Sequence, residues 1–166
     1  MNKFKKQLII LLGILVLAFV LRFVQLGQIP NSLNWDEVSW GYNAYSILET
    51  GRDEYGDYLP LSFRAFGDYK QPVYVYLQMP FIKLFGLNAY SVRLPSALLG
   101  SLSVLFVYML TRELFTALRH KEQIALTTAF FFAVSPWSIQ FSRVAYEANV
   151  GLFFVLVGTW GFLRGL

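Results

Sequence analysis

Four stretches of this sequence are apolar enough and long enough to cross a membrane. Each carries at most one charged residue, and they cover residues 7–24, 94–111, 123–141 and 148–163. An α-helix needs about 20 such residues to span the roughly 30 Å of hydrocarbon in a bilayer. Because 56% of all residues are hydrophobic, a water-soluble domain is excluded. The sequence predicts an all-α integral membrane protein with about four transmembrane helices.

The charged residues argue against a nucleic-acid ligand. The formal net charge is +4, but the lysines and arginines lie beside the apolar stretches, where they orient helices, and they form no basic face. The sequence contains no cysteine, which excludes disulfides and thiolate metal sites. We therefore expect membrane lipid, and no nucleic acid, as a partner.

The first apolar stretch has the charge pattern of an uncleaved signal anchor. Lys3, Lys5 and Lys6 precede it, and the segment RFVQLGQIP that follows lacks the small residues of a signal-peptidase site. The N-terminus is therefore predicted to be cytoplasmic. We expect Arg22, near the far end of the stretch, to extend its guanidinium group toward the membrane surface.

A fifth apolar segment, residues 72–86, is too short to span a bilayer comfortably. It would be roughly 22 Å long as a helix, and it carries Pro80 and Lys83. If it lies at the interface, the basic loop TRELFTALRHKEQ becomes cytoplasmic, in agreement with the positive-inside tendency. We expect one membrane domain over residues 1–166, with an outer loop of about residues 25–93 that contains this amphipathic helix.

Two adjacent acids, Asp36 and Glu37, follow the first apolar stretch in the segment SLNWDEVSWGYNAYSI. Asn34 and Glu37 have the spacing of a capping box, so Glu37 is either a helix cap or a site residue. Asp36 is not needed for the cap, and it is either a solvated surface acid or part of a site at the membrane edge. The helix that begins after Asn34 is expected to end at Gly51. Its apolar stripe consists of Val38, Tyr42, Tyr45 and Leu48.

Three further charged residues lie at the ends of predicted helices. Lys70 precedes the helix over residues 72–86, where backbone N–H groups also favour an anion, so it either binds phosphate or anchors the helix at the interface. Arg143 and Glu147 lie four residues apart, between the third and fourth spanning helices. They form either an ion pair worth about 0.3 to 0.5 kcal/mol or part of a polar cavity.

With these residues assembled, the chain resembles the N-terminal part of membrane glycosyltransferases with the GT-C fold. This group includes the protein O-mannosyltransferases of glycosyltransferase family 39 and the lipid A aminoarabinose transferase. The resemblance rests on the DE pair, on YKQPVYVYL, on SVRLPSALLGSLSVLFVYMLTRELF and on SRVAYEANVGLFF. The second motif is similar to a Lys-Pro-Pro segment of the family, with Gln71 in place of the first proline. Glu147 stands where an aspartate is commoner in the family.

The resemblance implies transfer of a sugar from a polyprenyl-phosphate donor to a protein, lipid or glycan acceptor, with inversion at the anomeric carbon. It places the reaction on the extracytoplasmic face of a bacterial or archaeal plasma membrane. Asp36 would be the general base, and Glu37 and Glu147 would orient the acceptor, the base or a divalent metal ion. The residues that would hold the phosphate are Lys70, Arg93 and Arg143. We expect no resident cofactor, because these carboxylates form no recognisable metal motif.

The chain is shorter than the many-helix bundle of that family. We therefore expect a fragment, a truncated reading frame or one part of a divided enzyme. The alternative is a non-catalytic membrane subunit that binds a polyprenyl lipid or a partner transferase. Ser96 and Gly100, four residues apart, offer a small-residue face on which another helix packs.

Overall fold

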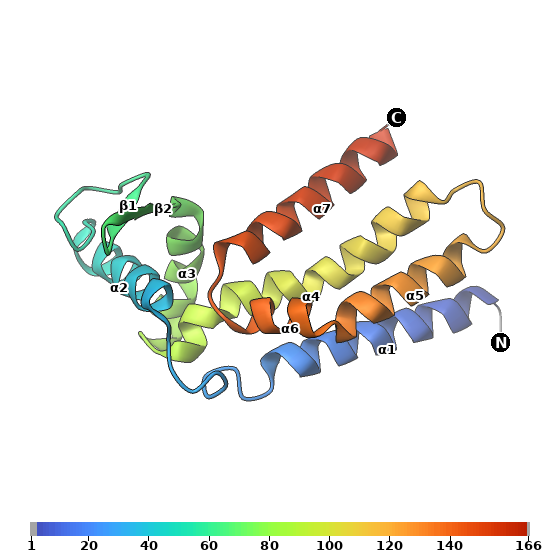
Figure 1. Ribbon diagram of the computed structural model, residues 1–166, viewed down its shortest axis with the longest axis horizontal. Helices are drawn as coiled ribbons and strands as arrows, with labels where there is room; N and C mark the ends of the chain where they lie inside the picture. Colours follow the sequence, from blue (N-terminus) through green and yellow to red (C-terminus); the bar gives the residue numbers. More distant parts are fainter. Residues whose placement is uncertain (1–2, 166) are drawn as a thin grey trace.

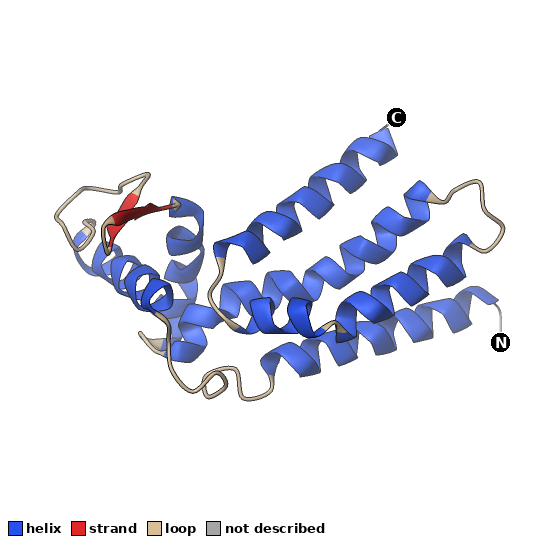
Figure 2. Cartoon of the chain, viewed as in Figure 1, coloured by secondary structure: helices blue, strands red, loops and turns tan. Residues whose placement is uncertain are grey.

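The computed structural model describes residues 3–165, as seven helices and one short β-hairpin (Figures 1 and 2). The helices are α1 (Lys3–Phe23), α2 (Trp35–Thr50), α3 (Pro72–Phe85), α4 (Ala89–Leu114), α5 (Lys121–Val134), α6 (Pro136–Arg143) and α7 (Glu147–Gly165). The hairpin pairs β1 (Phe63–Ala65) antiparallel with β2 (Asp68–Lys70).

The predicted fold class, an all-α integral membrane protein, is confirmed. Helices α1, α4 and α7 are long and apolar enough to cross a membrane, and α5 with α6 makes a fourth candidate. The segment over residues 123–141 is not one straight helix, because α5 and α6 are bent by 54° at Ser135. Pro136 explains the break, since proline has no N–H group for the helical ladder and its ring displaces the preceding turn.

Helix α4 is the centre of the bundle and contacts all six other described helices. It begins five residues earlier than predicted, because Asn88 and Ser91 form a capping box. Helices α1 and α5 present small side chains to α4 in the core, and these allow the helices to approach one another closely. The core residues of this part of the bundle are Leu11, Ile14, Ala18, Val104, Tyr108, Ala125, Leu126, Ala129 and Ala133.

The connecting segments lie at the two ends of the bundle. In Figure 1 the start of α1, the α4–α5 loop and the end of α7 lie at one end, while α2, the hairpin and α3 lie at the other. This arrangement matches a single long outer loop with α3 outside the bundle. Which side of the membrane each end faces stays a prediction.

The local signals for α2 and α3 are confirmed. Asn34 and Glu37 form the complete capping box at the start of α2, and Gly51 ends that helix in the left-handed conformation, with φ 73°. Helix α3 has Pro72 in its first turn and Gly86 as its C-cap. Its 14 residues correspond to roughly 21 Å, which is shorter than a membrane span.

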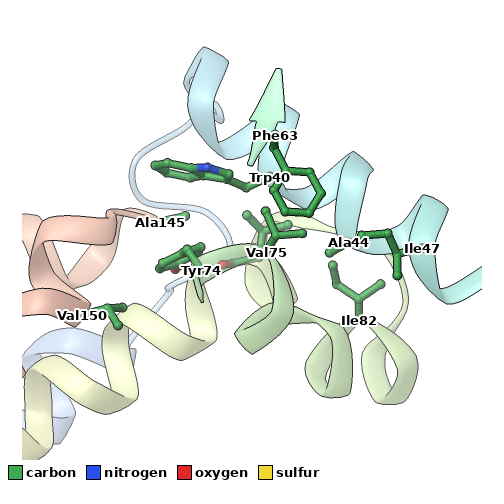
Figure 3. Packing of buried hydrophobic residues seen from close by; sticks show 10 residues of the cluster. Trp40, Ala44, Ile47, Phe63, Tyr74, Val75, Ile82, Ala145 and Val150 are labelled. Carbon is green, nitrogen blue, oxygen red and sulfur yellow. Dashed lines mark hydrogen bonds between the residues drawn. The ribbon is translucent and has the colours of Figure 1, made fainter. Parts of the chain in front are cut away.

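A compact apolar core joins α2, α3 and the hairpin to the end of the bundle (Figure 3). The rings of Trp40 and Tyr74 lie 5.2 Å apart between centroids, and Phe63 of β1 is fully buried beside them. Helix α2 therefore faces this core with Trp40, Ala44 and Ile47. The predicted stripe residues Val38, Tyr42 and Tyr45 are exposed, and of the predicted stripe only Leu48 packs against this core.

Arg22 corrects one sequence prediction. Its side chain does not extend to the membrane surface but is completely buried. It donates to the Ala133 carbonyl at 3.1 Å, to Ser138 Oγ at 2.8 Å and to Ser142 Oγ at 3.2 Å. The Ala133 carbonyl is available because a carbonyl near a helix end lacks its usual N–H partner, and α6 supplies the two hydroxyl groups. A guanidinium group with that many partners is stable inside the bundle.

Ser96 and Gly100 pack within the chain. Asn149 of α7 donates to the Ser96 carbonyl at 2.9 Å and to its hydroxyl at 3.0 Å, and the Ser96 hydroxyl donates to Phe141 at 3.0 Å. A Cβ atom at Gly100 would overlap the Ser142 side chain. The small residues of α4 thus let α6 and α7 approach it closely.

Candidate active site

The first turn of α2 directs its two acids to different environments. Glu37 points inward and is 1% exposed, whereas the Asp36 side chain is 38% exposed. Adjacent helical residues are about 100° apart around the axis, so one faces the core when its neighbour faces the surface. The capping box fixes this rotation because Glu37 must reach back to Asn34.

Glu37 is the centre of a buried ion-pair network. Its Oε1 atom accepts from Arg93 Nε at 2.9 Å and from the Ala145 N–H at 2.8 Å. Its Oε2 atom accepts from the Asn34 N–H at 2.9 Å and from Arg93 Nη2 at 3.3 Å. Both oxygens are therefore occupied, and the side chain joins α2, α4 and the α6–α7 connection.

Arg93 and Arg143 hold the chain between α1 and α2. Arg93 donates to the carbonyl groups of Leu26 at 3.1 Å, Pro30 at 2.8 Å and Ser32 at 2.8 Å. Arg143 donates to four carbonyl groups of the same region, those of Leu21, Val24, Gln25 and Ile29. Both guanidinium groups are buried. Among the ion pairs of residues 3–165, none joins Arg143 to Glu147.

The β-hairpin brings Lys70 to Asp36. Lys70 Nζ lies 3.1 Å from Asp36 Oδ1 and 3.2 Å from Asp68 Oδ2. Neither the hairpin nor the contact with Asp68 was predicted from the sequence. The available signal was the dipeptide Phe66-Gly67. In the structure both residues have positive φ values (51° and 85°), as in the two-residue turns that close tight hairpins. The flanking strands have only three residues each, too few for a visible alternating pattern.

The contacts around Lys70 shift the pKa values of Lys70 and Asp68 in opposite directions. The hydrogen bond to Asp36, and after it the bond to Asp68, raises the pKa of Lys70 above its ordinary value. The pKa of Asp68 is lowered, mainly by the Tyr69 N–H that it accepts and then by Lys70. One cation thus lies between two anions, and the three groups carry a net charge of −1.

These three groups face an open hollow of about 410 Å³. Two exposed aromatic residues form its walls, Trp35 from α2 and Phe66 from the hairpin turn, and their ring centroids are 5.8 Å apart. The lining residues are Asn34, Trp35, Asp36, Ala65, Phe66, Asp68 and Lys70. We call this space the acid–lysine hollow.

Glu147 begins α7 beside a smaller cavity of about 100 Å³, which Gln71 and Tyr74 also line. Its Oε2 atom is buried and has no hydrogen-bond partner within residues 3–165. A buried carboxylate oxygen without a partner is costly in a purely structural role. Glu147 thus lines a cavity of its own at the start of α7, and a role for it in the acid–lysine hollow stays a prediction.

The family model described as dolichyl-phosphate-mannose-protein mannosyltransferase matches residues 69–166, which is more than half of the chain. The chain belongs to this mannosyltransferase family. The matched region contains Lys70, Arg93, Arg143 and Glu147, whereas Asp36 precedes it.

A bacterial relative extends the likeness to almost the whole chain. "Putative mannosyltransferase YkcB" of Bacillus subtilis (strain 168) is 29% identical over 163 residues, which is 96% of this chain and 21% of the relative. The chain thus spans about a fifth of the length of the mannosyltransferase relative that it matches. No solved structure matches the chain.

Proposed function

We propose that this chain contributes to a glycosyltransferase site that moves a sugar from a polyprenyl-phosphate-linked donor to an acceptor on the extracytoplasmic face, with inversion. The observation that carries the proposal is the pair of Asp36 and Lys70, 3.1 Å apart in an open hollow at the end of the bundle where α2 and α3 lie (Figure 1). A base and a cation side by side are the two groups that such a transfer needs.

Asp36 is the general base of the proposed reaction. The acceptor hydroxyl attacks the anomeric carbon from the side opposite the phosphate and gives its proton to the Asp36 carboxylate. The bond between the anomeric carbon and the phosphate oxygen breaks, and its electrons leave with the polyprenyl phosphate. Asp36 suits this role because its side chain is partly exposed and is not used in the helix cap.

Lys70 is the phosphate ligand of the proposed reaction. It is held by Asp36 and Asp68, and an arriving phosphate competes with these carboxylates for its three N–H donors. When Lys70 turns to the phosphate, Asp36 loses its ion-pair partner and becomes free to accept a proton. Charge developing on the departing phosphate then strengthens the contact with Lys70 in the transition state.

The remaining charged residues support the site. Glu147 orients the acceptor or Asp36 in this proposal, because its carboxylate has an oxygen without a hydrogen-bond partner within residues 3–165. Glu37, Arg93 and Arg143 are positioning residues, since their polar atoms are bound to the frame that holds α2. Within residues 3–165 no group of three acidic or histidine side chains has the geometry of a metal site, and we assign no step to a metal ion.

The test compares transfer and donor binding in membranes of the producing cell. Asp36→Asn should lower single-turnover transfer at least about a hundredfold and leave donor binding almost unchanged, as expected for loss of a general base. Lys70→Ala should instead weaken donor binding. Asp57→Asn removes an exposed acid outside the hollow and is the matched control.

Two results would contradict the proposal. Unimpaired transfer by Asp36→Asn would return Asp36 to the role of a surface acid. Donor binding without any Asp36-dependent transfer would favour the alternative, a non-catalytic subunit that binds a polyprenyl lipid.

A further inference from the structure

The acid–lysine hollow has an aromatic side that the proposed chemistry does not use. Trp35 is 75% exposed and Phe66 is 65% exposed, although both are large apolar side chains. Their rings meet edge to face, at 62°, so each ring keeps a free face. Exposed aromatic rings are common where a membrane protein meets lipid. These two, however, line the same hollow as Asp36, Asp68 and Lys70.

A sugar ring matches this combination of surfaces. A pyranose has faces of C–H bonds, which pack on an aromatic ring, and an edge of hydroxyl groups, which donate to carboxylates. Binding sites for small ligands commonly combine apolar walls with a few placed polar groups. The hollow supplies aromatic walls and the two carboxylates, and its volume of about 410 Å³ is of the size that a small ligand occupies.

Asp68 has the freedom to bind a hydroxyl group. Its side chain is 72% exposed, and each of its oxygens has one partner, the Tyr69 N–H for Oδ1 and Lys70 for Oδ2. A carboxylate oxygen accepts two hydrogen bonds, so acceptor capacity remains on both atoms. Asp68 and Phe66 are held next to each other in space because Ala65 pairs with Asp68 across the tight turn.

We propose that Trp35, Phe66 and Asp68 form the subsite for the sugar of the donor. The aromatic rings contact the C–H face of the sugar, and Asp68 accepts from its hydroxyl groups. This inference rests on the proposed function, which places the donor phosphate on Lys70, two residues from Asp68 along β2. The sugar is bonded directly to that phosphate and must therefore lie within a few ångströms of it. The hairpin then selects the sugar, while Lys70 binds the part of the donor common to all such lipids.

The experiment measures binding of two lipids to the solubilised protein, undecaprenyl phosphate and mannosyl-phosphoryl-undecaprenol. Trp35→Ala and Phe66→Ala should each weaken binding of the mannosylated lipid by about tenfold, which corresponds to about 1.4 kcal/mol. Neither should change binding of the unglycosylated lipid by more than about twofold. Asp68→Asn should also reduce the preference for the mannosylated lipid. Trp137→Ala removes an equally exposed tryptophan, 73% exposed, outside the hollow and is the control.

The two proposals fail in different ways. If Trp35→Ala and Phe66→Ala change both lipids equally, or change neither, the sugar subsite is refuted. If Lys70→Ala leaves binding of both lipids intact, the phosphate assignment fails whatever the aromatic variants do. Retained binding of undecaprenyl phosphate also shows that an aromatic variant is folded.

Discussion

Glu37 and Asp36 are neighbours in the sequence, yet we expect substitutions of the two to differ sharply in their effect on stability. Glu37→Gln keeps the shape of the side chain and can retain the contacts of Oε1 with Arg93 Nε and the Ala145 N–H. The new NH₂ group then replaces Oε2 and faces two donors, the Asn34 N–H and Arg93 Nη2. Two hydrogen bonds are lost, and the Asn34 N–H and the Arg93 Nη2 group each face the new NH₂ group, which is also a donor.

The magnitude follows from the burial of the pair. Arg93 is completely buried, and removing one member of a buried ion pair costs about 3 to 5 kcal/mol. Three carbonyl groups still accept from Arg93, so we expect a value near the lower limit, about 3 kcal/mol. Asp36→Asn breaks a partly exposed ion pair and should cost less than about 1 kcal/mol.

The assay is the free energy of unfolding of the purified protein in mixed micelles, titrated with a denaturing detergent and followed by tryptophan fluorescence. A Glu37→Gln protein no less stable than Asp36→Asn would refute the buried-network argument. The double variant that combines Glu37→Gln with Arg93→Met is an independent check. Because that variant leaves no unpaired charge, its cost should be smaller than the sum of the two single costs.

Three further predictions concern packing, pH and topology. Gly100→Ala should reduce the free energy of unfolding by about 1 to 3 kcal/mol, because its Cβ overlaps Ser142; unchanged stability in the same detergent titration would show that α6 moves freely. The folded-state pKa of Lys70 is raised, so its contribution to stability should be complete below the unfolded pKa and lost as pH rises through the folded one. Titration of the wild type against Lys70→Met from neutral to alkaline pH checks this, and equal pH dependence would contradict it. Single cysteines at the exposed positions Lys83 and Arg119 should be labelled from the outside and from the cytoplasm respectively; labelling from the same side would overturn the topology.

Local signals predicted the elements of the fold well. The predicted spans follow from the lengths of the uncharged apolar stretches. Within these spans only the break at Ser135 was not predicted, because the apolar segment continues without interruption across it. A capping box of Asn34 and Glu37 was predicted as one of two roles for Glu37, and Gly51 was predicted as the helix end, since a cap depends on residues within one helical turn. The donor, the acceptor and the roles of the site residues stay proposals.

What the sequence determined by itself is what short-range chemistry decides: the membrane environment, the helices, their caps and the family motifs. Only the tertiary structure decided where each charge goes. Arg22 is buried because the α5–α6 break, more than a hundred residues along the chain, supplies acceptors. Glu37 is buried because Arg93 and Ala145 reach it from distant segments, while Asp36 stays open. The cost of burying a charge depends on its partners, and these are set by packing and not by neighbouring residues.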